Sequence, residues 1–479
     1  MKICVLQPDY SASTVDYRHY DPHRDLSRLL PGHTVDHVAL NKLSTYRQLK
    51  ELSKRNYDIF VNLCEGYLEW DVPSIDVITS FELLDLPYTG PGPELYDVPK
   101  ELMKYVAHTV DVKTPPYVLV ESTADAERAA KLLNFPLFVK PAKAGDSLGV
   151  DHQSLAHDEV ELMAKVTAVL PEYPELLVEE YIAGREFTVL VVAKPDGSRR
   201  CESFTPVEFI FPEGNEFKTY SLKVTEPHPE ANIPVRDPEL AARLRKSAER
   251  IFWGFSGVGY ARMDFRMNDK GELYFLELNF TCSVFYSDGY EGSADYILKH
   301  DGIGQAGFAE KIIAEGMARY ARKKRPFETK GSAISGYGIH ATRALKLGEI
   351  VFRGEERSQR IVTRKYVMDR WNADDQAVFR HYAIPLTDEV YLLWDGDPSQ
   401  WAPENHSCEP NTAFVGLDVV ALVPIARGEE LTLDFGELLG EDIEPFECHC
   451  GAKSCRGIVR GAAGNSVSAR ESARVEAGG

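Results

Sequence analysis

The sequence predicts an α/β protein followed by a smaller module rich in β-strands, and three observations support this prediction. Near the start of the chain, the apolar run KICVLQ, the helical stretch TYRQLKELSKR and the apolar run DIFVNLC follow one another. A polar β-hairpin is predicted over residues 258–279. From residue 332 onward, short strands with glycine turns dominate. Alternating strands and helices indicate an α/β layer, and the later change of character indicates a separate module.

Length and composition bound the class of protein. A chain of 479 residues is longer than one hydrophobic core usually serves, so we expect two to four domains. The hydrophobic content of 44% and charged content of 27% are typical of soluble globular proteins. Neither a membrane-spanning run nor a secretory signal is recognisable. We therefore expect a soluble cytoplasmic protein that binds no membrane, and the net charge of −20 argues against nucleic acid as a partner.

The first strand–helix–strand unit predicts a parallel layer over residues 1–95, which ends in the Pro/Gly-rich stretch ELLDLPYTGPGPE. Open sheets bind ligands beyond the carboxyl ends of their strands. Asp9, Tyr10 and Ser11 follow the first strand and are therefore candidates for substrate contact. A polar connecting loop explains these residues equally well.

The hairpin predicted at residues 258–279 is the centre of the functional hypothesis. Arg262 and Asp264 are two residues apart, as are Glu277 and Asn279, so each pair lies on one face of an extended strand. The turn signal NDKG between them would bring the four side chains together. Two carboxylates and an amide oxygen form a hard oxygen site suited to Mg²⁺ that bridges nucleotide phosphates. The alternative is a solvated face on an amphipathic hairpin.

Lysines and glycines upstream indicate a phosphate site. Lys100 lies in the predicted helix VPKELMKYVA, and Lys140 ends a β-rich run before a loop that contains Gly145, Ser147 and Gly149. Glycines let backbone N–H groups approach phosphate oxygens, and a lysine supplies a point charge. The pattern differs from the P-loop because no GK[ST] follows, and a plain hairpin loop would also explain it.

The stretch LLVEEYIAGREFTVLVV predicts a strand, a short turn and a second strand. The first strand ends at Glu179, Glu180 and Ile182, and the second carries Glu186. The exposed backbone at a strand end can bond an adenine edge, and a nearby carboxylate can bind ribose hydroxyls. Lys218 in GNEFKTYS adds a further cation for phosphate.

Taken in order, these blocks resemble the ATP-grasp superfamily, and D-Ala-D-Ala ligases in particular, over about residues 80–300. The resemblance implies a three-subdomain α/β (α+β) ligase with an N-terminal domain at 1–95 and an ATP-grasp domain at 96–325. It implies that ATP phosphorylates a substrate carboxylate and that an amine attacks the acyl phosphate to give an amide. The expected partners are small-molecule amino acids or peptides, and the ligase relatives are often homodimers.

The resemblance also implies a role for each matching residue. Lys100 and Lys140 would hold ATP phosphates, with Ser147 in the loop that closes over them and Lys218 near the γ-phosphate. Glu179, Glu180 and Ile182 would form the adenine hinge, and Glu186 would bind the ribose. Asp264, Glu277 and Asn279 would ligate Mg²⁺, with two ions expected from the family, and Arg262 would stabilise the tetrahedral intermediate.

Two departures from the ligase pattern concern the substrates. The loop QPDYSAS after the first strand lacks the glutamate that the family uses to recognise its first D-alanine. Phe280, Thr281, Cys282 and Ser283 stand where the family has a Ser-Pro-Gly type sequence. We therefore expect the same reaction type with a different acid and amine.

The chain changes character after a predicted helix that ends in a basic run, with a boundary near Lys330. The segment FECHCGAKSCRG places Cys448, Cys450 and Cys455 at metal-ligand spacing, and Cys408 is the candidate fourth ligand. Buried cysteines without a metal are the alternative.

Residues 330–460 resemble a SET domain with its post-SET zinc segment, on the blocks GYG, NHSCEPN, ELTLDF and CHCGAKSC. The resemblance implies a β-rich fold, S-adenosylmethionine contacts from Gly336, Gly338, Asn405 and His406, and one structural Zn²⁺ on the four cysteines. Methyltransferases of this family have a tyrosine where this chain has Phe435, and the missing hydroxyl argues against efficient methyl transfer. The polar tail at 461–479 is expected to be disordered.

Three hypotheses for function follow. The first is an ATP-dependent amino acid or peptide ligase with an accessory SET module, which the set at the hairpin favours. The second is a lysine methyltransferase whose ATP-grasp half positions a substrate. The third is a non-catalytic scaffold that binds nucleotides.

Overall fold

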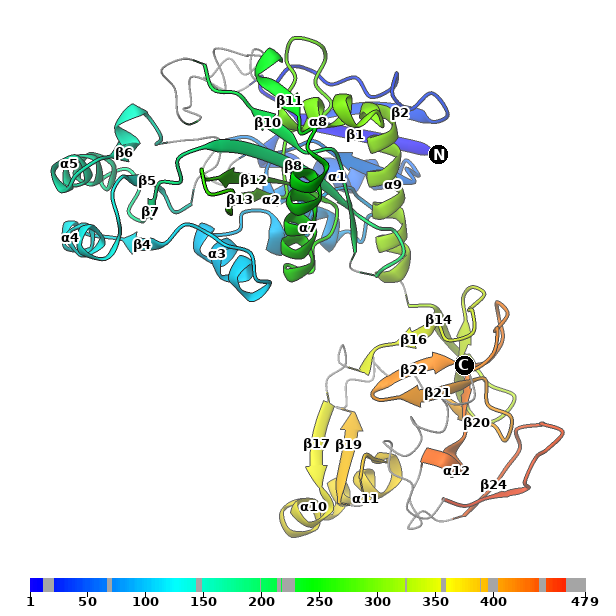
Figure 1. Cartoon of the computed structure of the whole chain (residues 1–479). Coiled ribbons are helices and arrows are strands. Elements are labelled where there is room, and N and C mark those ends of the chain that lie inside the picture. The colour runs from blue at the N-terminus through cyan, green and yellow to red at the C-terminus, as the bar shows by residue number, and fades with distance from the viewer. Residues whose placement is uncertain are drawn as a thin grey trace. The chain divides into compact units, whose positions relative to one another are not determined.

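The structure is a computed structural model, and it divides the chain into two compact units, Met1–Ala321 and Arg322–Gly479 (Figure 1). It describes residues 1–11, 21–66, 71–143, 149–198, 200–212, 217, 229–323, 325–354, 359–387, 389–394, 404–438 and 445–461. Within these ranges, none of the helices has the length and apolar character needed to cross a bilayer. The predicted boundary between residues 95 and 96 stays a prediction, and nearly all of the predicted tail lies outside the described residues.

The first layer is a parallel three-stranded sheet in the order β2-β1-β3. Its elements are β1 (Lys2–Pro8), β2 (Thr34–Leu40), η2 (Lys42–Ser44), α1 (Thr45–Ser53), β3 (Ile59–Asn62), α2 (Ile75–Leu83) and η3 (Pro93–Leu95). β1 lies at the centre of this sheet, and six of its seven residues are therefore buried. The predicted parallel layer is confirmed; β2, whose residues are mostly half-buried, had not been predicted.

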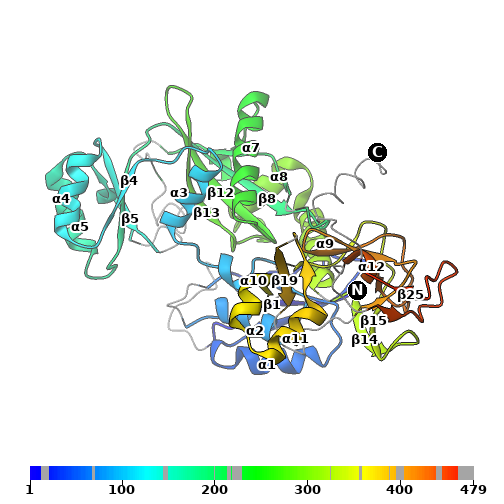
Figure 2. The ribbon, with the colours of Figure 1, turned by 90° about the horizontal axis from the view of Figure 1, so that it is seen from below.

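A small antiparallel sheet follows, in the order β4-β7-β5-β6. Its elements, with the preceding helix, are α3 (Lys100–Thr109), β4 (Tyr117–Val120), α4 (Thr123–Leu132), β5 (Leu137–Pro141), η4 (His152–Ser154), β6 (Leu155–Ala156), α5 (Glu159–Val169) and β7 (Leu176–Glu180). Leu137, Val139 and Val178 pack against the helices α4 and α5, which cover one side of the sheet (Figure 2). Strand alternation therefore turns Phe138 and Lys140 to the other side.

The central sheet is antiparallel and runs in the order β11-β10-β8-β12-β13, with β9 paired to β8. Its strands and helices are β8 (Arg185–Ala193), β9 (Cys201–Ser203), β10 (Val207–Phe209), η5 (Pro229–Ala231), β11 (Asn232–Pro234), α7 (Pro238–Gly254), β12 (Tyr260–Met267), β13 (Leu273–Asn279), α8 (Ser293–Asp301) and α9 (Gly304–Lys323). One face packs with α7 in a core that includes Val189 and Phe265. The other contributes Leu190 and Tyr260 to a core shared with β1, β3 and α9.

The second unit is rich in short strands, as predicted. Its elements are β14 (Phe327–Gly331), β15 (Tyr337–Ala341), β16 (Ile350–Phe352), β17 (Gln359–Thr363), α10 (Arg364–Arg370), α11 (Ala373–Tyr382), β18 (Ile384–Pro385), β19 (Val390–Trp394), β20 (Asn405–His406), β21 (Thr412–Val415), β22 (Asp418–Ala421), β23 (Thr432–Leu433), α12 (Phe435–Leu438), β24 (Phe446–Glu447) and β25 (Ile458–Val459). Phe327, Ile339 and Leu431 belong to its main apolar cluster, and Val367 and Phe379 belong to a smaller one.

Candidate active site

The hairpin of β12 and β13 brings four polar side chains to one face of the central sheet. In its antiparallel register, Arg262 lies opposite Asn279 and Asp264 lies opposite Glu277. Arg262 Nη2 is 3.3 Å from Asp264 Oδ2. The turn is held by Asn268, whose Oδ1 accepts hydrogen bonds from two backbone N–H groups at 3.1 and 2.9 Å. The structure therefore brings together the residues that the spacing had paired.

The donor set on this hairpin fits a divalent cation. Asp264 is buried and Glu277 is half-buried, and both line a pocket between the central and the small sheet. Asn279 Oδ1 accepts hydrogen bonds from the backbone N and the Oγ1 of Thr281, at 2.8 and 3.1 Å. The two carboxylates are thus the hard-oxygen pair that suits Mg²⁺, and the amide oxygen also holds the loop that follows β13.

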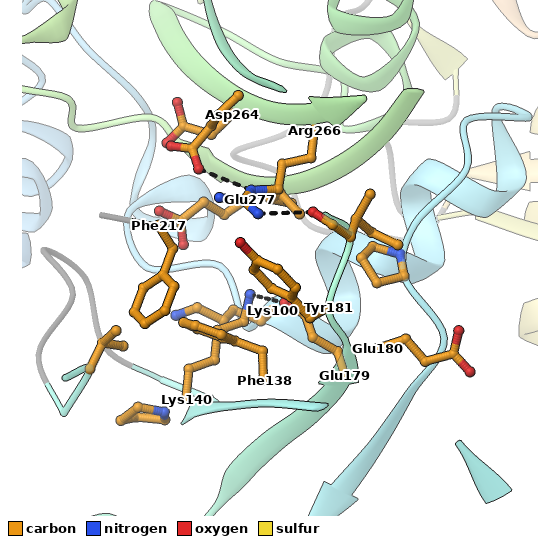
Figure 3. Close-up of a pocket in the computed structure, with 16 residues that line it drawn as sticks. Lys100, Phe138, Lys140, Glu179, Glu180, Tyr181, Phe217, Asp264, Arg266 and Glu277 are labelled. Atoms are coloured by element: carbon orange, nitrogen blue, oxygen red, sulfur yellow. Dashed lines mark hydrogen bonds and ion pairs between the residues drawn. The ribbon is translucent and has the colours of Figure 1, made fainter. Parts of the chain in front are cut away.

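Lys140 and Glu179 line the opposite wall of the pocket, and the buried Lys104 supports this wall through its ion pair with Glu179. Lys140 Nζ lies 2.5 Å from Glu179 Oε1, and Lys104 Nζ lies 2.6 Å from Glu179 Oε2. Burial alone would raise the pKa of Glu179, but the two ammonium groups hold this pKa at about 2. Burial lowers the pKa of the neighbouring Lys100, an effect that Glu277 opposes. The wall thus presents cations from β5 and α3 toward the carboxylates of the hairpin (Figure 3).

The connection between β7 and β8 forms the third side of the pocket. Glu180 and Ile182 line it, although the carboxylate of Glu180 accepts hydrogen bonds from Asn134 N and Nδ2 at 2.9 and 2.8 Å. Ile182 O accepts a hydrogen bond from Arg266 Nη1 at 2.8 Å. Glu186 also lines the pocket and lies 3.2 Å from Arg266 Nε. Two side chains assigned to the adenine hinge thus have partners within the protein. The Glu179 carboxylate binds Lys104 and Lys140, and the Glu180 carboxylate binds Asn134.

Sequence reasoning missed two charged residues, Arg266 in the pocket lining and Lys104, which holds the lining residue Glu179. Lys104 lies one helical turn after Lys100, so the i, i+4 spacing could have placed it on the same face. Arg266 lies two residues after Asp264 and shares its strand, so the period of two could have found it. Ser147 and Lys218, assigned to the phosphates, lie outside the described residues.

A buried charge cluster joins the first layer to the loop after β13. Arg24 is 2% exposed, and its guanidinium lies 3.0 Å from Asp21 Oδ1 and 3.3 Å from Glu65. It also donates hydrogen bonds to Leu63 O at 3.0 Å and to Val284 O at 3.1 Å. One guanidinium thus connects the end of β3 with the segment that follows Asn279.

Aromatic side chains complete this cluster. Tyr286 OH donates to Asp21 Oδ1 at 3.1 Å, the Tyr286 ring stacks on Arg24, and Tyr10 OH donates to the other oxygen of Asp21. Tyr10 had been a candidate for substrate contact, and its hydroxyl is engaged here. The other candidates of that loop bond each other, since Asp9 Oδ1 accepts from Ser11 N at 2.9 Å.

In the second unit, four cysteine side chains converge. The Sγ atoms of Cys408, Cys448, Cys450 and Cys455 all lie within 4.8 Å of one another. The Sγ atoms of Cys408 and Cys448 are 3.8 Å apart. A tetrahedral Zn²⁺ with Zn–S bonds of about 2.3 Å separates its thiolates by about 3.8 Å, so the group fits such an ion.

Backbone and side chains around β20 form a second polar site in this unit. Asn405 Nδ2 donates to Ser335 O at 3.1 Å and to Tyr337 O at 3.3 Å, which ties it to the Gly336–Gly338 segment. His406 Nδ1 accepts a hydrogen bond from Phe435 N at 3.0 Å. The four residues assigned to S-adenosylmethionine are thus neighbours, with Phe435 beside them.

Comparisons with known proteins agree with this architecture. A model described as D-ala D-ala ligase C-terminus matches residues 106–284, and a SET domain model matches residues 336–436. A D-alanine–D-alanine ligase of Syntrophotalea carbinolica is 34% identical over 201 residues, which are 41% of this chain and 61% of the relative. One of Solibacter usitatus is 30% identical over 253 residues, 51% of this chain and 72% of the relative.

The solved structure of the D-alanine-D-alanine ligase from Coxiella burnetii matches 67% of this chain and 97% of its own, with a TM-score of 0.50 at 16% identity. Two sheets enclosing a pocket lined by lysines and carboxylates, together with this likeness, define an ATP-grasp fold. The chain belongs to the D-alanine–D-alanine ligase family, and its second unit contains a SET domain. It spans about three fifths of the length of the first curated relatives it matches.

The buried charge cluster predicts a pH effect on stability. Burial raises the pKa of Glu65 from 4.5 to about 7, although Arg24 opposes the shift. Between these pH values the folded protein keeps a proton that the unfolded chain has released, so the free energy of unfolding falls as pH rises, by roughly 3 kcal/mol. Glu65→Gln should remove this part of the pH dependence, measured as the urea midpoint of the first unit at pH 4.5 and 7.5.

The matched control is Glu51→Gln, because Glu51 is exposed on α1. It should keep the wild-type dependence on pH. An unchanged pH slope in Glu65→Gln would contradict the assignment of a buried, protonated carboxyl.

Proposed function

We propose that the protein is an ATP-dependent carboxylate–amine ligase that joins amino acids or small amino-acid derivatives through an acyl phosphate. The observation that supports this most directly is the register of the hairpin, which places Arg262 and Asp264 opposite Asn279 and Glu277. Of these side chains, Asp264 and Glu277 line a pocket whose opposite wall carries Lys100 and Lys140. Family membership supports the same reaction type.

In the first step, different described residues bind the phosphates and the metal ion. Lys100 and Lys140 supply positive charge for the ATP phosphates, and the buried pairing with Glu179 orients Lys140. A substrate carboxylate oxygen attacks the γ-phosphorus, the bond from phosphorus to the ADP oxygen breaks, and an acyl phosphate forms. Mg²⁺ held by Asp264 and Glu277 would neutralise phosphate charge when bound.

In the second step, the amine nitrogen attacks the acyl carbon and negative charge develops on its oxygen. Phosphate then leaves with the electron pair of the carbon–oxygen bond, and the nitrogen loses a proton to solvent. Arg262 is half-buried on the hairpin and contributes a fixed positive charge, so it stabilises the oxyanion. Its hydrogen bond to Asp264 orients the guanidinium beforehand.

The substrates differ from those of the relatives in this proposal. The loop after β13 carries a fully buried Cys282 instead of the family sequence, and the loop after β1 lacks the family glutamate. Screening the amino acids singly and in pairs for Mg²⁺-dependent release of ADP and phosphate tests the proposal. Release that needs a particular acid and amine, with a product of the summed mass less water, supports a ligase. Nucleotide binding with no turnover for any pair would favour the scaffold hypothesis.

Arg262→Ala should lower amide formation by about 10²- to 10³-fold, because charge on the tetrahedral oxygen is no longer neutralised. ATP affinity should stay within about threefold of the wild type. Product formation by mass spectrometry and ATP binding by calorimetry measure the two effects separately. Loss of ATP affinity without a selective loss of amide formation would show that Arg262 serves the nucleotide instead.

For the second unit we propose an accessory role with little methyl transfer. The ring of Phe435 lies 5.8 Å from the His406 ring and 6.2 Å from the Phe446 ring, so an aromatic cluster occupies the position where the family has its hydroxyl. Gly336, Gly338, Asn405 and His406 would form the S-adenosylmethionine site if that cofactor binds. The alternative is a protein-lysine methyltransferase.

Phe435→Tyr should raise methyl transfer above the wild-type level, because the hydroxyl helps to align the amine with the methyl donor. Transfer of labelled methyl groups from S-adenosylmethionine to lysine peptides, and to the protein itself, measures the effect. Efficient transfer by the wild type would instead support the methyltransferase hypothesis, and equal background rates in both proteins would remove the missing hydroxyl as the explanation.

The four cysteines are proposed to hold one structural Zn²⁺. Cys450→Ser should lower the zinc content and loosen the second unit, because a thiolate ligand is lost. Elemental analysis by mass spectrometry and the thermal transition of the second unit check this. Cys201→Ser is the control, since Cys201 lies on β9 of the first unit, and a zinc content equal to that of the wild type in Cys450→Ser would refute the site.

A further inference from the structure

Arg266 is a buried cation whose role in the pocket is not explained by the ligase reaction described above. It is 2% exposed and lies directly opposite Glu186 in the register of β12 and β8. Arg266 Nε is 3.2 Å from Glu186 Oε2, and Glu186 is itself only 6% exposed. Both residues line the pocket, and Figure 3 labels Arg266 there. A buried carboxylate is therefore matched with a buried guanidinium beside the connection between β7 and β8.

The same guanidinium is held on its other sides. Its Nη1 donates to Ile182 O at 2.8 Å, and its carbon lies 4.7 Å from the centre of the Tyr181 ring and 5.5 Å from that of Phe211. Stacking fixes the plane of the guanidinium, and the hydrogen bonds fix its rotation within that plane. Arg266 thus sets the distance between Glu186 and the backbone of the connection from β7 to β8.

The charge on Glu186 determines how many hydrogen bonds its carboxyl oxygens can accept. An ionised carboxylate taken out of water is costly unless it is paired, and without a cation it would become protonated. A carboxylate in its ionised form offers acceptors to two adjacent hydroxyl groups, whereas a protonated acid offers fewer. The other described acids near the connection are engaged elsewhere, since Glu179 binds two lysines and Glu180 binds Asn134.

We propose that Arg266 is a positioning residue that keeps Glu186 ionised and oriented toward the vicinal hydroxyls of a ribose, so that the pair selects ribonucleoside over 2′-deoxyribonucleoside triphosphates. This inference rests on the proposed function, because it takes ATP as the occupant of the pocket. It adds a residue whose effect is on the choice of nucleotide and not on the chemical step.

The test compares the binding of ATP and of 2′-deoxy-ATP, each with Mg²⁺, by calorimetry on the full chain. The wild type should prefer ATP by about tenfold or more, since a hydrogen bond to a charged acceptor is lost with the 2′-hydroxyl. In Glu186→Gln and in Arg266→Met the preference should fall to within about twofold. In the double variant it should fall no further, because the two residues act as one unit.

Arg266→Lys tests the fork geometry and also covers the case in which Arg266→Met does not fold. A lysine keeps the charge but lacks the planar donors, so the preference should be intermediate. The control is the neighbouring pair on β8 and β10, where Arg185 Nε and Nη2 lie 2.7 and 2.6 Å from the two oxygens of Glu208. That pair is absent from the residues that line the pocket, so Arg185→Met should keep the wild-type preference.

The outcomes separate the two proposals. If the wild type binds neither nucleotide, the proposed function fails. If the wild type binds ATP and 2′-deoxy-ATP equally, the inference about Arg266 is overturned and the ligase proposal stands. The same holds if Arg266→Met and Arg266→Lys both keep the full preference for ATP while Glu186→Gln loses it. An equal loss of affinity for both nucleotides, with the preference retained in the Arg266 variants, likewise overturns it.

Discussion

The register of β12 between β8 and β13 is the constraint on which the rest of the first unit depends. Tyr260, Arg262, Asp264 and Arg266 alternate onto one face of the strand, and their intervening neighbours Ala261, Met263 and Phe265 enter the apolar core on the other. A slip by one residue would bury the charges in that core and expose its apolar side chains. The apolar residues that fix the register therefore also fix the functional side chains.

Along that face, the surroundings change gradually from core to pocket. Tyr260 packs with the apolar residues of the first layer, whereas Asp264 and Arg266 line the pocket, and Arg266 bonds the connection between β7 and β8. The charges along this route are buried or half-buried and paired, Arg262 with Asp264 and Arg266 with Glu186. Paired charges favour one geometry, and the proposed ligase reaction needs its phosphate and carboxyl groups held in line.

The sequence predicted the parts of this site that depend on local spacing. Asp264 and Glu277 could be paired because a period of two and a turn signal lie within one short stretch. The same holds for the cysteines of the second unit that follow one another closely. The partner of Glu186 could not be predicted in this way, since Arg266 lies 80 residues away along the chain and only the pairing of β8 with β12 joins them.

Arg24 shows the same limit more strongly, because its contacts come from two distant segments, one at residues 63–65 and one at Val284. They include backbone carbonyl groups that no side-chain pattern reveals. The contacts of the Glu179 and Glu180 carboxylates could not be predicted for a related reason, and the adenine-hinge assignment stays a prediction. Their order along the strand was readable, but which way each carboxylate turns depends on Lys104 and Asn134, which lie on other elements.

Gly184, in the connection between the two sheets, has a wider consequence. Its φ is +129°, and a Cβ there would lie 2.2 Å from Met267 O, so main chain rests directly on main chain. The span from the small sheet to the central sheet is therefore set by the polypeptide backbone itself. Substitutions among the pocket side chains leave this backbone contact untouched, so the proposed acid and amine sites could be altered while the two sheets keep their spacing.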